Sequence, residues 1–189
     1  MTIVLVGMHG AGKTTIGRAL ATRLRVPFHE EVGRVLAETI RPPERTAADC
    51  WVAVDEAVFD AELARDAAWA PGAPRVVETW HPGNLAYAAR RSPLLASRKL
   101  GEVRAALVRH PAVVLPVRVP SALAAARQHE RGELDFFAAV GLEAEGWAAR
   151  LGLCLLPPVV NDGSVEDAVA AALEFLTTRA PVAHRLELA

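Results

Sequence analysis

Short apolar runs alternate with longer amphipathic stretches along this chain. Five runs rich in β-branched residues predict strands, at 2–6, 26–29, 75–79, 112–119 and 153–160. Stretches with apolar residues three and four apart predict helices, at 13–25, 31–40, 46–70, 121–130, 134–151 and 165–178, with further helical sequence between a turn at 81–84 and about residue 110. Because continuous apolar strands are buried on both faces, the alternation predicts a parallel sheet covered by helices.

Composition narrows the class of protein. The 189 residues, 52% of them hydrophobic and 23% charged, suit one compact domain, which we place at 1–178 with a C-terminal tail at 179–189. The net charge of −1 argues against a nucleic-acid partner, because such proteins carry a basic excess. No basic leader precedes the first strand, and no uncharged stretch reaches membrane-spanning length, so we expect no membrane partner and a cytoplasmic location. The sequence leaves a homodimer open.

A complete phosphate-binding loop follows the first strand. Gly7-Met8-His9-Gly10-Ala11-Gly12-Lys13-Thr14 fits G-x-x-x-x-G-K-[ST] at every required position, between a buried strand and a helix. Glycines let backbone N–H groups turn toward phosphate oxygens, Lys13 adds a full positive charge, and the Thr14 hydroxyl suits Mg²⁺. We expect ATP and Mg²⁺ at this loop, held by Gly7, His9, Gly10, Ala11, Gly12, Lys13, Thr14 and Thr15.

Acidic residues stand where ligands approach such a sheet. Glu78 ends the third predicted strand, and Glu30 and Glu31 follow the second, which places all three at the carboxyl edge beside the loop. Glu78 suits either a role at Mg²⁺ or the acceptance of a substrate proton. Consecutive residues of an extended segment point to opposite sides, so one of Glu30 and Glu31 should face the cleft.

Other polar and aromatic residues extend this candidate site. Arg127 and Arg131 share one helix face and could close over a transferred phosphoryl group, although pairing with neighbouring glutamates would explain them too. The polar turn at 161–164 could pack beside a nucleotide base or simply cap the next helix. Four aromatic residues could form a stacking wall for an acceptor, with core packing as the alternative: Trp51, Phe59, Trp80 and Tyr87.

Together these features resemble the nucleoside and nucleotide kinase group of phosphate-loop proteins, close to deoxynucleoside kinases and thymidylate kinases. The resemblance runs from Thr2 to about Leu176 and implies a three-layer α/β/α fold with five parallel strands in the order 2-3-1-4-5. It also implies an arginine-bearing lid at about 127–135. The implied catalytic residues are Lys13, Glu30, Glu78, Arg127 and Arg131, and the implied adenine-side residues are Asn161 and Asp162.

The sequence says less about the molecule that accepts the phosphoryl group than about the nucleotide that donates it. Glu31 and Arg34 match a Glu-x-x-Arg of neighbouring kinase-like proteins, but Thr79 stands where the kinase group has arginine. The Asn-Lys-x-Asp of regulatory GTPases is absent from the sequence, and large motor and AAA-type ATPases have more residues. The resemblance implies ATP- and Mg²⁺-dependent phosphoryl transfer to a small nucleoside-like or nucleotide-like acceptor. The alternatives are a kinase for another small alcohol and a nucleotide-binding switch or ATPase without an acceptor.

Overall fold

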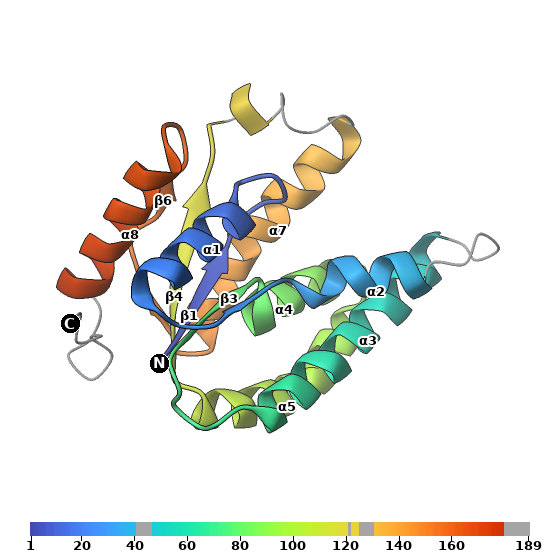
Figure 1. The fold of residues 1–189 in the computed structure, drawn as a ribbon. Coiled ribbons are helices and arrows are strands. Elements are labelled where there is room, and N and C mark those ends of the chain that lie inside the picture. The colour runs from blue at the N-terminus through green and yellow to red at the C-terminus, as the bar shows by residue number, and fades with distance from the viewer. Residues whose placement is uncertain (41–46, 121, 125–130, 180–189) are drawn as a thin grey trace.

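Parallel strands and helices alternate along the chain (Figure 1). The structure is a computed structural model that describes residues 1–40, 47–120, 122–124 and 131–179. Its strands are β1 (Thr2–Val6), β2 (Phe28–His29), β3 (Arg75–Glu78), β4 (Ala112–Arg118), β5 (Cys154–Leu155) and β6 (Val159–Val160). The helices in the described ranges are α1 (Lys13–Leu24), α2 (Val32–Ile40), α3 (Ala47–Ala68), α4 (Trp80–Arg91), α5 (Pro93–Arg109), α7 (Arg131–Arg150) and α8 (Val165–Thr178).

The sheet has the order β2-β3-β1-β4-β5, as predicted, and β6 pairs with β4. Every pairing is parallel. All five residues of β1 are buried, and the strand lies between β3 and β4, with Leu5 opposite Glu78. The phosphate loop therefore leaves the middle of the sheet directly beside the end of β3.

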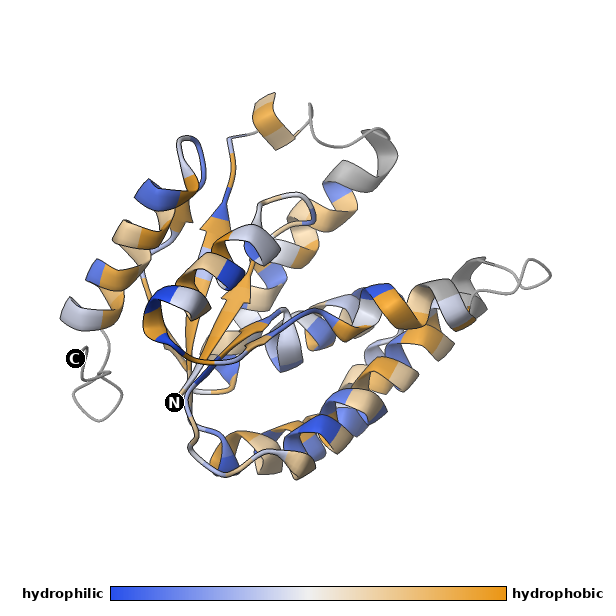
Figure 2. Ribbon diagram, viewed as in Figure 1, coloured by the Kyte–Doolittle hydropathy of each residue, from blue (hydrophilic) through white to orange (hydrophobic). Residues whose placement is uncertain are grey.

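Helices cover both faces of this sheet. Alternate β1 side chains face opposite layers: Ile3 and Leu5 pack with α1 and α8, whereas Val4 and Val6 pack with α4 and α7. Helices α3 and α5 form a further apolar cluster on α4 around Phe59. Figure 2 shows β1 and most of β4 as hydrophobic segments between these helices. No helix in the described ranges is long and apolar enough to cross a membrane.

Two predicted elements differ from the structure. The strand predicted at 153–160 is two short strands, because Pro157 and Pro158 lack the N–H groups that a strand ladder needs. The second of them, β6, pairs with the last residues of β4. The turn predicted at 81–84 is the first turn of α4. Pro82 is tolerated there because a first-turn N–H has no partner within the helix.

The backbone between β3 and α4 is strained. Thr79 (φ 69°, ψ −66°) and Trp80 (φ 43°) have positive φ values that non-glycine residues rarely adopt. Asp66 of α3 holds this turn: its carboxylate accepts a 3.0 Å hydrogen bond from Trp80 Nε1 and lies 2.6 Å from His81 Nε2. Trp80 and His81 come just after Glu78 in the chain, and their contacts with Asp66 are buried. These contacts therefore hold the backbone in place where it leaves β3.

Candidate active site

The loop between β1 and α1 has the backbone that phosphate binding requires. Gly10 (φ 77°) and Gly12 (φ 93°) adopt left-handed conformations, and a Cβ at Gly12 would lie 2.2 Å from Asn161 Nδ2. No side chain caps α1. Its first N–H groups are therefore not taken by a capping residue, and they lie where a helix N-terminus attracts anions. The loop thus fits the phosphates of a nucleotide.

Three side chains converge on the carboxylate of Glu78, which is 2% exposed. Thr14 Oγ1 donates a 2.8 Å hydrogen bond to Glu78 Oε2, and Lys13 Nζ lies 3.9 Å from Oε1 while donating to two loop carbonyls. Arg34 Nη2 also lies 3.9 Å from Glu78 Oε1. Burial raises the pKa of Glu78 above its ordinary value, against the opposing effects of Lys13 and Thr14.

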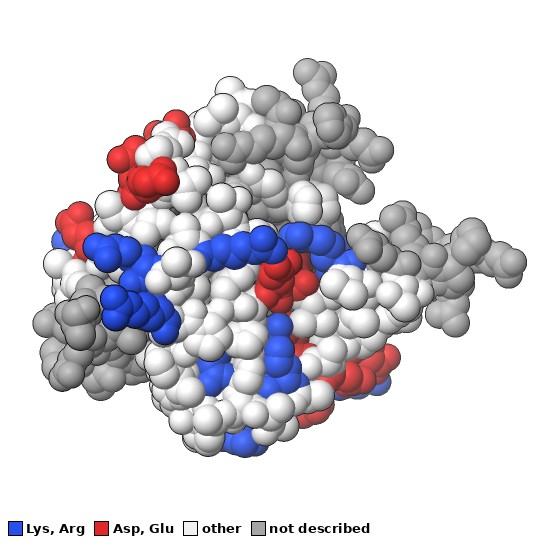
Figure 3. All heavy atoms as spheres, in the orientation of Figure 1, with Lys and Arg blue, Asp and Glu red and all other residues white. Residues whose placement is uncertain are grey.

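The two glutamates after β2 lie in different surroundings. Glu30 is paired with Arg18 of α1, and its side chain is 46% exposed. Glu31 is partly buried, and its negative charge contributes to the raised pKa values of Glu78 and Tyr87. Glu30 therefore pairs at the surface, whereas Glu31 shares the surroundings of Glu78, and the catalytic role of Glu30 stays a prediction. On the face drawn in Figure 3, acidic and basic side chains lie next to one another rather than in one basic patch.

Aromatic side chains gather around Arg91 at the far end of α4. The Arg91 guanidinium carbon lies 4.5 Å from the Trp51 ring centroid, 5.0 Å from that of Tyr87 and 5.2 Å from that of Phe136. Arg91 Nη1 donates a 2.6 Å hydrogen bond to Asp55 Oδ1. Trp51 and Tyr87 thus belong to one cluster, as a stacking wall would require. Trp80 is fully buried and bonded to Asp66, as the alternative of core packing predicts, so its role toward an acceptor stays a prediction.

Other predicted residues brace the phosphate loop. Asn161 is buried and its Nδ2 donates a 2.8 Å hydrogen bond to Ala11 O, so this side chain holds the backbone of the phosphate loop in place. The His9 ring lies 5.2 Å from that of Phe137 in α7. Asp162 and Thr15 are exposed. The neighbouring Ser164 caps α8 by accepting a hydrogen bond from Asp167 N, the alternative explanation for this turn.

Helix α7 packs directly against the loop. A Cβ at Gly141 would lie 2.8 Å from Met8 N, so only glycine allows this approach. The predicted lid begins outside the described residues: Arg127 lies outside them, and so does the side chain of Arg131, the first residue of α7. The roles of both arginines stay predictions.

Sequence reasoning missed the three buried acids in the described part of α3, which are Asp55, Asp66 and Glu62; Glu62 is 1% exposed and pairs with Arg65. Asp55 is 6% exposed and Asp66 is 3% exposed. A signal existed for Asp55, which stands four residues after Trp51 and four before Phe59, inside an otherwise apolar helix row. Burial raises the pKa of Asp55 to about 6, although Arg91 opposes the shift.

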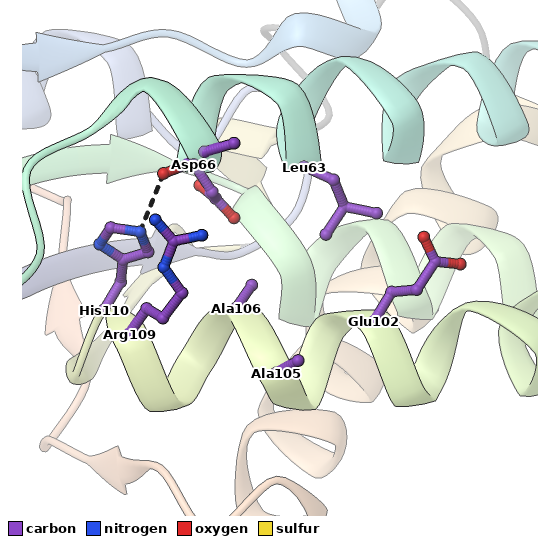
Figure 4. A pocket seen from close by; sticks show the side chains of 8 residues that line it. Leu63, Asp66, Glu102, Ala105, Ala106, Arg109 and His110 are labelled. Atoms are coloured by element: carbon purple, nitrogen blue, oxygen red, sulfur yellow. Dashed lines mark hydrogen bonds between the residues drawn. The ribbon is translucent and has the colours of Figure 1, made fainter.

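A separate cavity of about 250 Å³ lies between α3 and α5. Figure 4 shows Asp66 and His110 at one end of it, joined by a 3.0 Å hydrogen bond from His110 Nε2 to the Asp66 carbonyl. None of its lining residues belongs to the phosphate loop. This cavity is therefore distinct from the candidate active site.

The fold and this site define a phosphate-loop protein of the small-kinase type, in agreement with the predicted resemblance. The chain belongs to the AAA domain family, whose sequence profile matches residues 2–140.

The chain is similar to three named proteins. It is 44% identical over 92 residues to a shikimate kinase of Ruegeria pomeroyi, a match covering 48% of this chain and 45% of that protein. Its fold is similar to that of NadR in complex with NR (TM-score 0.64, 18% identity, 92% of this chain and 51% of NadR). It is also similar to thymidylate kinase from Ehrlichia chaffeensis (TM-score 0.59, 13% identity, 93% and 98%). The chain spans about half the length of the first two, and the two structures show the fold alone.

Proposed function

We propose that this protein transfers the γ-phosphoryl group of ATP to a hydroxyl group of a small acceptor. The observation that supports this most directly is the convergence of Lys13, Thr14 and Arg34 on Glu78. A basic residue for the phosphates, a hydroxyl for a metal ion and a carboxylate are the groups that phosphoryl transfer uses. They lie at the carboxyl edge of the sheet, where ligands of such folds bind.

The donor side is built for Mg²⁺ and ATP. The uncapped N-terminus of α1 and Lys13 would hold the phosphates. Thr14 and Glu78 would hold Mg²⁺, which when bound neutralises charge on the phosphates. The described residues contain no cluster of three or more potential metal ligands. That suits Mg²⁺, which is usually bound by few protein groups together with substrate phosphates and water.

On the acceptor side, Glu31 takes the proton of the attacking hydroxyl. The acceptor oxygen forms a bond to the γ-phosphorus, the bond from that phosphorus to the bridging oxygen breaks, and ADP leaves. Glu78 is less suited to this role because its carboxylate already accepts a hydrogen bond from the Thr14 hydroxyl. Arg34, whose side chain is 47% exposed beside Thr14, is placed to balance charge on the transferred group. Arg127 and Arg131 would add to this effect from the lid.

Two classes of acceptor follow. The resemblance to nucleoside and nucleotide kinases favours a nucleoside-like or nucleotide-like acceptor. The similarity to a shikimate kinase favours another small alcohol as the second candidate.

A transfer assay tests the proposal. The protein is incubated with Mg²⁺ and ATP labelled at the γ-phosphate, together with nucleosides, nucleoside monophosphates or cyclic polyols. We expect a labelled product with one of these groups and none with Lys13→Ala, which should keep its far-UV circular dichroism spectrum. Release of labelled phosphate at a rate that no acceptor changes would instead favour an ATPase or a switch.

A further inference from the structure

Asp55 and Arg91 form a closely paired unit within the aromatic cluster. Their 2.6 Å hydrogen bond joins α3 to α4, and their side chains are 6% and 16% exposed. Rings from three helices surround the guanidinium: Trp51 from α3, Tyr87 from α4 and Phe136 from α7. Cation–π contacts and the carboxylate hold Arg91 in a fixed position.

This unit lies at the end of the helix that begins beside the reacting groups. Helix α4 begins two residues after Glu78, and its 12 residues span about 18 Å. The long side chain of Arg91 shortens that distance, because helical side chains lean toward the N-terminus. Tyr87 lies between the two ends: its ring is 5.0 Å from Arg91 Cζ, and burial and then the charge of Glu31 raise the pKa of its hydroxyl.

Two buried polar atoms have no partner among the described residues, one in this unit and one in the first half of α4. Asp55 Oδ2 and Asn84 Nδ2 are both inaccessible to solvent and make no hydrogen bond with the described residues. Asn84 precedes Tyr87 by three residues and Arg91 by seven, so all three share one face of α4. An unpaired buried polar group is costly, so a ligand that pairs with these atoms removes part of that cost. One atom is an acceptor and the other a donor, which matches a hydroxyl or an amide.

The charges of this region are already balanced. Arg91 is paired with Asp55, and the adjacent Arg90 lies 3.4 Å from Glu143. A phosphate or carboxylate of the acceptor would have to compete with Asp55 for Arg91 and would lie beside a carboxylate oxygen. Like charges at such a distance are strongly unfavourable when buried.

We infer that Asp55 and Arg91 recognise the end of the acceptor remote from the transferred phosphoryl group, and that this end is uncharged and donates a hydroxyl or amide hydrogen to Asp55. This inference rests on the proposed function and narrows it. It favours an unphosphorylated, hydroxylated acceptor over a monophosphate or a carboxylic acid. Asp55 is then the residue that determines specificity.

Matched pairs of acceptors test this inference. Each pair differs by one anionic group: inositol with inositol monophosphate, and shikimate methyl ester with shikimate. Phosphorylation is measured as kcat/KM, and binding is measured by calorimetry with a non-hydrolysable ATP analogue present. The variant Asp55→Asn keeps the shape of the side chain and removes its charge. Asp60→Asn is the control, because Asp60 lies on the same helix, is 64% exposed and pairs with Lys99.

For the wild type we expect the neutral member of the productive pair to exceed the charged member by about 10-fold or more in kcat/KM, the effect of about 1.4 kcal/mol. Asp55→Asn should reverse that order, because Arg91 is then free to bind an anion, whereas Asp60→Asn should keep it. A wild-type preference for the charged member would overturn the inference even if Asp55→Asn failed to fold. So would an unchanged ratio in a folded Asp55→Asn protein.

The same data separate this inference from the proposed function. Neutral compounds that bind selectively without being phosphorylated would refute phosphoryl transfer and leave the recognition pair in place. Efficient phosphorylation of a charged member by the wild type would uphold phosphoryl transfer and remove the role given to Asp55. Failure of every neutral compound to bind or react would also remove that role.

Discussion

The hydroxyl of Thr14 donates a 2.8 Å hydrogen bond to Oε2 of Glu78, a residue 64 positions later in the chain. The bond forms because β1 and β3 are paired, with Leu5 opposite Glu78, so the loop and the end of β3 emerge together. When its proton points to Glu78, the Thr14 oxygen presents its lone pairs elsewhere. A hydroxyl oriented in this way can offer its oxygen to Mg²⁺ once the 3.5 Å hydrogen bond that it accepts from Arg34 Nη2 gives way.

Glu78→Gln should therefore raise the Mg²⁺ requirement. The glutamine amide no longer supplies a charged acceptor for Thr14 and cannot help to hold the ion. Supporting partners of metal ligands typically contribute about 10–100-fold in metal affinity or activity, and we expect a loss on that scale. The measurement is the transfer rate as a function of Mg²⁺ at fixed ATP. A curve that matches the wild type would remove Glu78 from the donor site.

The neighbouring glutamates offer a matched comparison. Glu31→Gln should lower kcat by about 10²–10⁴-fold, the usual contribution of a general base. Glu30→Gln should leave kcat close to that of the wild type, because Glu30 only pairs with Arg18 at the surface. Single-turnover kinetics on both variants checks this prediction. The opposite ranking would restore Glu30 as the base.

Two glycines of α7 should respond in opposite ways to alanine. Gly141→Ala would place a Cβ 2.8 Å from Met8 N, so it should displace the loop, weaken ATP binding and lower the melting temperature. Gly146→Ala meets no atom within 4 Å. It should raise the free energy of unfolding by about 0.5–1 kcal/mol, because alanine favours the helix. The melting temperature and the ATP affinity of both variants test this prediction. Equal values for the two variants would mean that the close approach of α7 to the loop does not matter.

Asp66→Ala should be among the most destabilising changes on α3. It would leave Trp80 Nε1 and His81 Nε2 without their carboxylate and release the strained turn after β3. Loss of one side of a buried charged network typically costs about 3–5 kcal/mol. Urea unfolding measures this change, with Asp60→Ala as the exposed control on the same helix. A loss below about 1 kcal/mol would show that the turn holds without Asp66.

Stability should depend on pH through Asp55. Its pKa is about 6 in the folded protein against an ordinary 3.8, so the folded state keeps this proton over a range in which the unfolded state has lost it. The free energy of unfolding therefore falls as pH rises from about 4 to about 6, by roughly 3 kcal/mol from this group. In urea unfolding at pH 4 and pH 6.5, the wild type should lose more stability than Asp55→Asn over that interval. An equal loss in both proteins would contradict this prediction.

The sequence by itself determined the parts of this protein that depend on consecutive residues. The phosphate loop needs only a buried strand, three glycines, Lys13 and Thr14 in one short segment, so its identity could be recognised without tertiary structure. The Ser164 cap of α8 is equally local. The placement of Glu78 at the carboxyl edge followed from the apolar run before it, because strand ends of a parallel sheet gather there.

The tertiary structure alone decided which side chains meet. Whether Glu30 or Glu31 shares the surroundings of Glu78 depends on how the chain turns from β2 into α2, and local sequence does not specify that turn. The turn predicted at 81–84 became helix because Asp66, 15 residues before His81, stabilises its first residues. The burial of Trp80 and the pairing of Asp55 with Arg91 have the same cause. Both depend on contacts between α3 and α4, two helices that pack together only in the folded protein.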